Sequence, residues 1–146
     1  MLRQFQRELI DDEGYVPEIY MCPAGKATFG VGHMIRQSDP EWGLPVGTPI
    51  SNKRILQALN QDMRYAIDDC YKILRNFPYL DQEIRLICGN MMFNLGFNRY
   101  KKFVQMKAAI EREDYKAAAE AMTDSLWHRQ LPERSTRLIE RMKAFS

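Results

Sequence analysis

The chain has 146 residues, of which 45% are hydrophobic and 27% charged, and its formal net charge is +2. These values are typical of a globular protein with one moderate domain or two small lobes, and so small a net charge argues against a nucleic acid partner. No apolar run reaches roughly 18 residues, so we expect no transmembrane segment. The first residues, MLRQFQRELIDDEG, lack the apolar core of a signal peptide.

The cysteines give little reason to expect a disulfide framework. There are three of them, Cys22, Cys70 and Cys88, and they are too few and too scattered for a disulfide framework or a zinc site. Cys70 and Cys88 fall within apolar patterns of helical spacing, where we expect them to be small buried residues. We therefore expect no metal and no cofactor.

The first segment is predicted to be a short amphipathic helix over residues 2–12. Its apolar residues recur at helical spacing, at Leu2, Phe5, Leu9 and Ile10. Glu13 closes the pattern, and Gly14 is the residue type that most often follows a helix end. Glu13 is therefore expected at a helix terminus, where a carboxyl group beside a cleft can serve as a general acid.

The next segment, from Tyr15 to Thr28, is predicted to be a β-hairpin. Its centre, Pro23-Ala24-Gly25, has the composition of a turn. Cys22 follows Glu13 by nine positions and precedes Thr28 by six. A hairpin that follows the first helix can place Cys22 and Thr28 across from Glu13.

A polar segment from Arg36 to Thr48 has the glycine and proline content of a loop. A loop this long in a compact domain is often functional. This one carries Trp42, whose flat ring could stack on a sugar or could instead cover the core of its lobe.

The rest of the chain is predicted to be helical. Apolar residues at helical spacing, after an expected N-cap at Ser51, indicate one helix over residues 51–75, roughly 37 Å long. A helix of that length in so small a chain should join two parts. Further helices are expected over residues 81–96, 100–112 and 114–122, followed by a short helix capped by Asp124 or Ser125 and a last helix that Pro132 opens.

Several of these residues together resemble a known motif. The N-terminal motif of phage-type lysozymes, glycoside hydrolase family 24, is similar to Glu13-Gly14, Tyr20, Gly25, Thr28, Gly30, Gly32 and His33. That family has a Glu, an Asp and a Thr at the spacing of Glu13, Cys22 and Thr28, so Cys22 stands where the family has Asp. The resemblance continues in the segments 90–96 and 127–137 and thus covers most of the chain.

The resemblance implies a lysozyme-like α+β fold. A small N-terminal lobe with a hairpin sheet, residues 12–50, would be joined by the helix over 51–75 to a helical C-terminal lobe, residues 76–146. The N-terminal helix, residues 2–12, would belong to the helical lobe. The cleft between the lobes would hold the substrate.

The resemblance also implies a function. The family hydrolyses bacterial peptidoglycan at the β-1,4 bond between N-acetylmuramic acid and N-acetylglucosamine. A chain of this kind is expected to be a monomeric phage endolysin for host cell lysis, made in the host cytoplasm and acting on the periplasmic cell wall. The sequence leaves open a second possibility, a lysozyme carried in the phage particle. Because no signal peptide is expected, a holin partner would have to open the membrane.

The resemblance assigns roles to individual residues. Glu13 would protonate the leaving oxygen, Thr28 would orient the attacking water, and Cys22 would take the place of the second carboxylate. Substrate-binding roles are expected for Trp42, Asn94 and Arg134. His33 is expected to be structural, in an ion pair with Asp62.

Each of these roles has an alternative. Cys22 could act as a thiolate, by its charge or as a nucleophile, or could merely fill space as a thiol. Thr28 could be an ordinary strand residue and Asn94 a helix cap. Arg134 could approach Glu13 or could be a solvated arginine.

Two other functions also fit the sequence. One is a peptidoglycan-binding module with a lysozyme fold that no longer hydrolyses. The other is a cysteine peptidase that uses Cys22 and His33. Against the peptidase, Cys22 precedes a proline in a turn rather than opening a helix, where the dipole would lower the pKa of the thiol.

Overall fold

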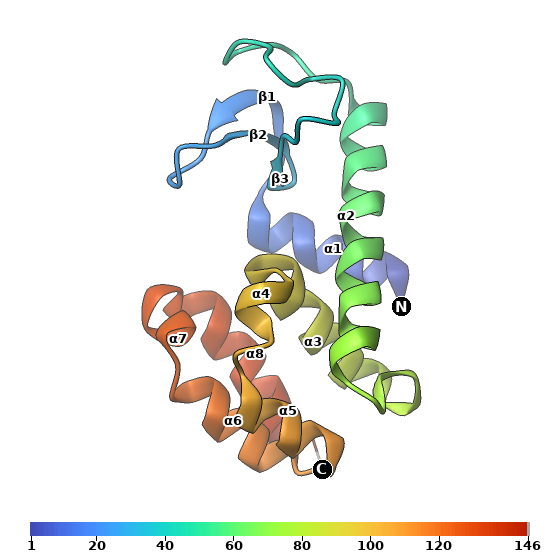
Figure 1. Cartoon of the computed structure of the whole chain (residues 1–146), viewed down its shortest axis with the longest axis vertical. Coiled ribbons are helices and arrows are strands. Elements are labelled where there is room, and N and C mark those ends of the chain that lie inside the picture. Colours follow the sequence, from blue (N-terminus) through green and yellow to red (C-terminus); the bar gives the residue numbers. More distant parts are fainter. Residues whose placement is uncertain (146) are drawn as a thin grey trace. The chain divides into compact units, whose positions relative to one another are not determined.

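The computed structural model describes residues 1–145 and is mostly helical, with one small antiparallel sheet (Figure 1). This architecture confirms the predicted α+β class. The strands are β1 (Val16–Met21), β2 (Ala27–Gly30) and β3 (His33–Met34). The helices are α1 (Leu2–Glu13), α2 (Asn52–Ile73), α3 (Gln82–Leu95), α4 (Phe97–Tyr100), α5 (Val104–Glu111), α6 (Tyr115–Thr123), α7 (Leu126–Gln130) and α8 (Pro132–Ala144), with a 3₁₀ turn, η1 (Phe77–Tyr79).

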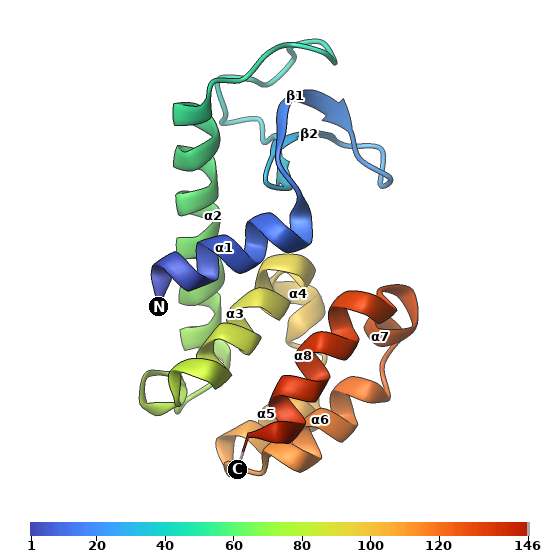
Figure 2. The ribbon, with the colours of Figure 1, turned by 180° about the vertical axis from the view of Figure 1, so that it is seen from behind.

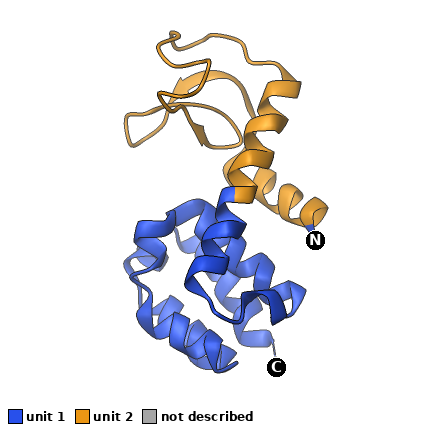
Figure 3. Ribbon diagram, turned by 45° about the vertical axis from the view of Figure 1, so that its right-hand side comes forward, with its two compact units in different colours: residues 1, 65–146 blue, residues 2–64 orange. Residues whose placement is uncertain are grey.

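The chain forms two compact units, which Figure 3 shows in different colours. The first unit is Leu2–Arg64, and the second contains Met1 and the chain from Tyr65 onward. Helix α1 therefore belongs with the sheet, whereas the sequence analysis grouped it with the helical lobe. Helix α2 contributes its first half to one unit and its second half to the other.

The first unit is built from α1, the sheet and the start of α2. Helix α1 buries Phe5 and Leu9 and ends where Gly14, at φ +83°, donates its N–H to the carbonyl of Ile10. The strands follow in the order β1-β2-β3, all antiparallel. Buried residues on both sides of the sheet and on α2, among them Ile19, Phe29, Val31, Ile55 and Leu59, form the core.

The outer edge of β1 is covered by the loop that precedes α2. The N–H of Ile19 donates to the carbonyl of Thr48 at 3.0 Å, and the N–H of Ile50 donates to that of Pro17 at 2.9 Å. The segment predicted as a loop is thus held to the sheet by backbone hydrogen bonds. At its end, Ser51 Oγ accepts the N–H of Arg54 at 3.1 Å, as expected of an N-cap.

The second unit packs its helices around α3. Most of α3 is buried, and α8 packs against both α3 and α6 (Figure 2). The helix predicted over 100–112 begins later than expected, at Val104, because α4 ends at Tyr100 and Phe103 has non-helical dihedral angles. Pro132 opens α8 and Ser125 caps α7, as the sequence predicts. Among residues 1–145, no helix is both long and apolar enough to cross a lipid bilayer.

Candidate active site

Glu13 is the last residue of α1, and its half-buried side chain lies beside Gly32, in the turn between β2 and β3. A Cβ atom added to Gly32 would fall 3.2 Å from Oε2 of Glu13 and 3.3 Å from its Cδ. Gly32 also has φ +63°, a conformation that favours glycine. The glycine after β2 therefore leaves the space that the carboxyl group of Glu13 occupies.

Cys22 and Thr28 lie on either side of the tight turn between β1 and β2. The N–H of Cys22 donates to the carbonyl of Lys26 at 2.9 Å, and the N–H of Gly25, at φ +78°, donates to the carbonyl of Cys22 at 2.8 Å. Thr28 is buried in β2, directly opposite Tyr20 of β1. The turn predicted at Pro23-Ala24-Gly25 is the feature that brings Cys22 and Thr28 together.

The surroundings of Cys22 favour its thiolate form. The backbone N–H of Lys26 and then the hydroxyl of Thr28 lower the pKa of the Cys22 thiol, and the small effect of burial opposes them only in part. The backbone N–H of Ala24 adds to the same effect. Because the thiolate is the reactive and charged form of cysteine, this turn suits a chemical role better than a space-filling one.

The hydroxyl of Thr28 has a choice of partners. In the structure it donates to the carbonyl of Lys26 at 2.8 Å. A hydroxyl carries one proton, so Thr28 cannot donate to Lys26 and to the Cys22 thiolate at the same time. While its proton points to Lys26, its oxygen lone pairs remain able to accept a hydrogen bond from the Cys22 thiol or from a water molecule.

Tyr20 connects the helix end to the turn. Burial raises the pKa of its phenol, and the negative charges of Cys22 and Glu13 raise it further. Tyr20 lies directly opposite Thr28 in the sheet and two residues before Cys22. The sequence analysis counted Tyr20 in the motif but did not assign it to the site.

Two other acidic residues of the first unit, Glu18 and Asp39, do not replace the missing carboxylate. Glu18 lies at the opposite edge of β1, in a bridge with Pro49 and close to Gly47. Asp39 is engaged with His33 and Arg54. Neither residue is at the position of Cys22 in the sequence motif, where the family has Asp.

His33 is buried between two carboxylates. Its Nδ1 lies 2.6 Å from Oδ2 of Asp62, the expected partner, and its Nε2 lies 2.8 Å from Oδ2 of Asp39, which the sequence analysis did not assign. Burial is the largest influence and opposes the charged ring, but the hydrogen bonds and charges of Asp62 and Asp39 outweigh it and raise the pKa of His33. With both ring nitrogens facing carboxylates, His33 does not supply a base to Cys22, which argues against the peptidase.

A second set of ion pairs anchors the loop before α2. Arg54 donates from Nε and Nη2 to the two carboxylate oxygens of Glu41, at 2.8 and 2.9 Å, and from Nη2 to Asp39 at 3.4 Å. Its guanidinium also lies over the ring of Phe29. These contacts fix the start of the loop while leaving Trp42 at its surface.

Trp42 is 56% exposed, so it does not cover the core of its unit. The alternative that the sequence left open for this residue is therefore wrong. Its backbone N–H donates to the carbonyl of Asp39 at 3.1 Å, which holds the indole on an ordered turn. An exposed ring on an ordered turn is suited to stacking on a sugar.

Asn94 and Arg134 lie in the second unit. Asn94 is inside α3, whose C-cap is Gly96, so Asn94 is not the helix cap; its Oδ1 accepts the indole N–H of Trp127 at 2.8 Å. Arg134 is only 8% exposed and donates from Nε to Oδ1 of Asn90 at 2.9 Å, so it is not a solvated arginine. The expected approach of Arg134 to Glu13 stays a prediction.

Metal ligands do not gather in the described part of the chain. Within residues 1–145, no group of three or more His, Cys, Asp or Glu side chains is arranged to hold a metal ion. Cys70 and Cys88 are both buried, and burial raises the pKa of the Cys88 thiol to about 12. These two thiols are therefore inert core residues, in contrast to Cys22.

Comparisons with known proteins agree on one family. The model of the family described as phage lysozyme matches residues 11–144. "Probable T4-type lysozyme 2" of Dictyostelium discoideum is 26% identical over an alignment of 147 positions. The alignment covers 88% of this chain and 86% of that protein.

Two phage proteins match over a small part of their own length. "Peptidoglycan hydrolase gp36" of Pseudomonas phage phiKMV is 25% identical over 97% of this chain and 16% of its own length. "Pre-baseplate central spike protein Gp5" of Enterobacteria phage T4 is 25% identical over 87% of this chain and 25% of its own length. The present chain thus corresponds to one segment of each of these larger proteins.

Proposed function

Since the chain belongs to the phage lysozyme family, we propose that it is a muramidase that cleaves the β-1,4 bond between N-acetylmuramic acid and N-acetylglucosamine. Membership of this family supports peptidoglycan hydrolysis as the activity. The choice of the glycosidic bond rests on one observation above all. In the first unit, the carboxyl group of Glu13 lies against Gly32, and a tight turn brings Cys22 and Thr28 together at the spacing of the family motif.

Glu13 is the general acid in this proposal. Glycosidases protonate the leaving oxygen with one carboxylic acid while the sugar develops oxocarbenium character. Glu13 ends a helix, and its carboxyl group lies against Gly32, in space that a larger residue at that position would take. A fixed proton donor contributes typically 10²- to 10⁴-fold to such reactions.

Cys22 carries the second role, normally that of a carboxylate. Its thiolate is negatively charged, as an aspartate would be, and the backbone N–H of Lys26 is the largest influence that stabilises it. A negative charge beside the anomeric carbon stabilises the developing positive charge, and a thiolate is also able to attack that carbon. Either route requires the deprotonated form of Cys22.

Thr28 positions the water in this proposal. Its hydroxyl donates to the carbonyl of Lys26, which directs the oxygen lone pairs elsewhere. A water molecule that donates to Thr28 Oγ1 would be oriented by a group that is itself fixed within a strand. Orientation of this kind lowers the entropic part of the barrier.

Trp42, Asn94 and Arg134 are proposed to bind the glycan. Trp42 offers an exposed ring, and Asn94 keeps its amide N–H₂ donors after its oxygen has accepted the Trp127 indole. Arg134 is held by Asn90, and its approach to Glu13 is part of the same proposal.

The biological role follows from the proposed activity. We expect a monomeric endolysin for host cell lysis, made in the host cytoplasm and released to the periplasmic cell wall by a holin. The phage-encoded peptidoglycan hydrolase among the relatives and the proposed cell-wall substrate support a role in phage infection.

Analysis of the products tests the proposal. Purified peptidoglycan is incubated with the protein, the new reducing ends are reduced with borohydride, and the reduced sugars and free amino groups are measured. Reduced muramic acid among the products is the expected result. Reduced glucosamine would indicate cleavage of the other glycosidic bond, and new amino groups without reducing ends would indicate a peptidase. Peptidoglycan that binds the protein but stays intact would indicate the non-hydrolytic module.

A further inference from the structure

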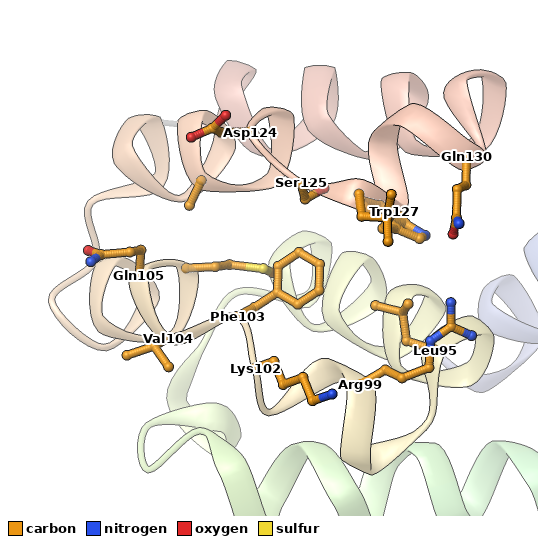
Figure 4. Close-up of a pocket in the computed structure, with 13 residues that line it drawn as sticks. Leu95, Arg99, Lys102, Phe103, Val104, Gln105, Asp124, Ser125, Trp127 and Gln130 are labelled. Carbon is orange, nitrogen blue, oxygen red and sulfur yellow. The ribbon is translucent and has the colours of Figure 1, made fainter.

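A groove lies within the second unit, between the segment from α4 to α5 on one side and α6 and α7 on the other. Its volume is about 440 Å³ (Figure 4). Its floor is apolar: Phe103 packs edge-to-face on the ring of Trp127, with ring centroids 6.4 Å apart, and Leu95 and Met106 are buried beside them. Trp127 is only 3% exposed and its N–H is bonded to Asn94, so the floor is fixed.

One wall of the groove carries a cluster of positive charge. Arg99 and Lys102 line this wall in Figure 4. Lys101, between them in the chain, does not line the groove but is exposed beside it, with its ammonium group over the ring of Phe97. Within the described residues 1–145, none of these three cations takes part in an ion pair. The lining contains a single acidic residue, Asp124, on the facing side. Positive charge therefore dominates at this rim.

Exposed apolar side chains flank the same groove. Val104 is 65% exposed at the start of α5, and Leu126 is 59% exposed at the start of α7. Both line the groove, one on each side. Two large apolar side chains therefore lie beside cations that have no carboxylate partner among the described residues. Together they form an amphipathic surface, whose charged part is well solvated by water and whose apolar part is not.

We propose that this surface, Arg99, Lys101, Lys102, Val104 and Leu126, docks on anionic lipid bilayers. The three cations would lie against the phosphate groups of the lipids, and Val104 and Leu126 would enter the boundary between headgroups and acyl chains. Charge complementarity selects this occupant: the cations favour an anionic surface, and the exposed apolar side chains favour one with an apolar layer directly beneath the charges. A soluble anion would use only the cations.

Vesicle binding tests the proposal independently of any hydrolysis. Association is measured by co-sedimentation with vesicles of phosphatidylcholine alone and with vesicles of equal parts phosphatidylcholine and phosphatidylglycerol. The protein should bind the mixed vesicles and not the neutral ones, and added salt should weaken the binding because exposed charges are screened. Equal binding to both kinds of vesicle, or to neither, would overturn the proposal.

Two double variants separate the two parts of the surface. Lys101→Gln with Lys102→Gln should weaken binding to the mixed vesicles about thirtyfold, at roughly fivefold per cation removed. The matched control, Lys53→Gln with Lys116→Gln, removes the same charge from exposed lysines elsewhere and should bind as the parent does. If both variants lost the same affinity, only the net charge would matter and the surface would have no special role.

The apolar part has its own matched pair. Val104→Ser with Leu126→Ser should weaken binding, whereas Leu2→Ser with Val46→Ser, at positions 62% and 59% exposed, should not. Soluble glycerol phosphate at the same phosphate concentration should not compete with the vesicles. Effective competition would show a site for a small anion and would contradict docking on a bilayer.

Discussion

The carboxyl group of Glu13 lies directly against Gly32, since a Cβ added there would fall 3.2 Å from Oε2 of Glu13. We predict that Gly32→Ala displaces this carboxyl group and lowers kcat about tenfold, because small misplacements of a reacting group are costly. The φ of +63° at this position adds a loss of stability of about 1 kcal/mol. Steady-state kinetics and urea unfolding measure the two effects.

Gly43→Ala is the control for backbone strain. Gly43 has φ +87°, but no atom lies within 4 Å of an added Cβ. This variant should lose similar stability and keep its kcat. A similar fall of kcat in both variants would show that strain, and not the contact with Glu13, is responsible.

Cys22 should be required as a thiolate. We predict that alkylation of Cys22 abolishes hydrolysis and that Cys22→Ala lowers kcat about a hundredfold, because both remove the negative charge. Cys22→Asp should retain or increase activity, because a carboxylate is ionised over the whole working pH range. Release of reducing ends by the alkylated and variant proteins is the measurement.

The pH profile gives an independent check on Cys22. Activity of the parent protein should depend on pH in two opposite ways, because Cys22 must be ionised and Glu13 must be protonated. In Cys22→Asp, the rise of activity that follows ionisation of the residue at position 22 should move to lower pH. Equal activity of Cys22→Ala and the parent would show that the thiol has no chemical role and that Glu13 with a positioned water is sufficient.

The ion pairs of His33 should make the stability of the fold depend on pH in two separate pH ranges. The pKa of His33 is raised in the fold, so its contribution is fully present below the unfolded value near 6.5 and is lost as pH rises through the folded value. The pKa of Asp39 is lowered because the N–H of Arg36, His33 and Arg54 outweigh the opposing effect of burial, so its contribution is lost as pH falls through its folded value. Urea unfolding across pH should show both losses.

A His33→Gln variant tests the origin of the alkaline loss. It should lower the free energy of unfolding by about 3 kcal/mol near pH 6, because two largely buried carboxylates lose their shared partner. The loss of stability above pH 6.5 should then disappear. An NMR titration that gave His33 a pKa below 6.5 in the parent would contradict this account.

Asn94 should act through both the oxygen and the N–H₂ group of its side-chain amide. Asn94→Ala leaves the buried indole N–H of Trp127 without an acceptor and should cost about 2 kcal/mol of stability. Asn94→Asp keeps the acceptor and removes the N–H₂ donors, so it should fold normally and raise KM for peptidoglycan. If KM stayed at the parental value in a stable Asn94→Asp, the residue would be purely structural.

Local sequence signals account for the first unit. Gly14 ends α1, and the turn around Gly25 sets the pairing of β1 with β2. Both glycines adopt positive φ values, which glycine tolerates best, and both positions were predicted as a helix end or a turn. The position of Cys22 beside Thr28 follows from that pairing. The position of Cys22 relative to Thr28 could therefore be predicted from the sequence, because both residues belong to one local hairpin.

Contacts between residues far apart in the sequence could not be predicted in the same way. The bond from Trp127 to Asn94 joins residues 33 positions apart, and that from Arg134 to Asn90 joins residues 44 positions apart. Periodicity identifies buried faces but not partners across helices. It also missed the break before α5, because Phe103 and Met106 continue the apolar spacing while the backbone at Phe103 leaves the helical conformation.

The central claim is that Glu13 is the proton donor of a glycosidase. Glu13→Gln preserves the shape of the side chain and removes the acid, so the release of reducing ends from peptidoglycan is the most direct measurement. The account predicts a loss of at least about a hundredfold in kcat with an unchanged free energy of unfolding. A Glu13→Gln protein that folds as the parent does and keeps more than about a tenth of its activity would contradict the claim.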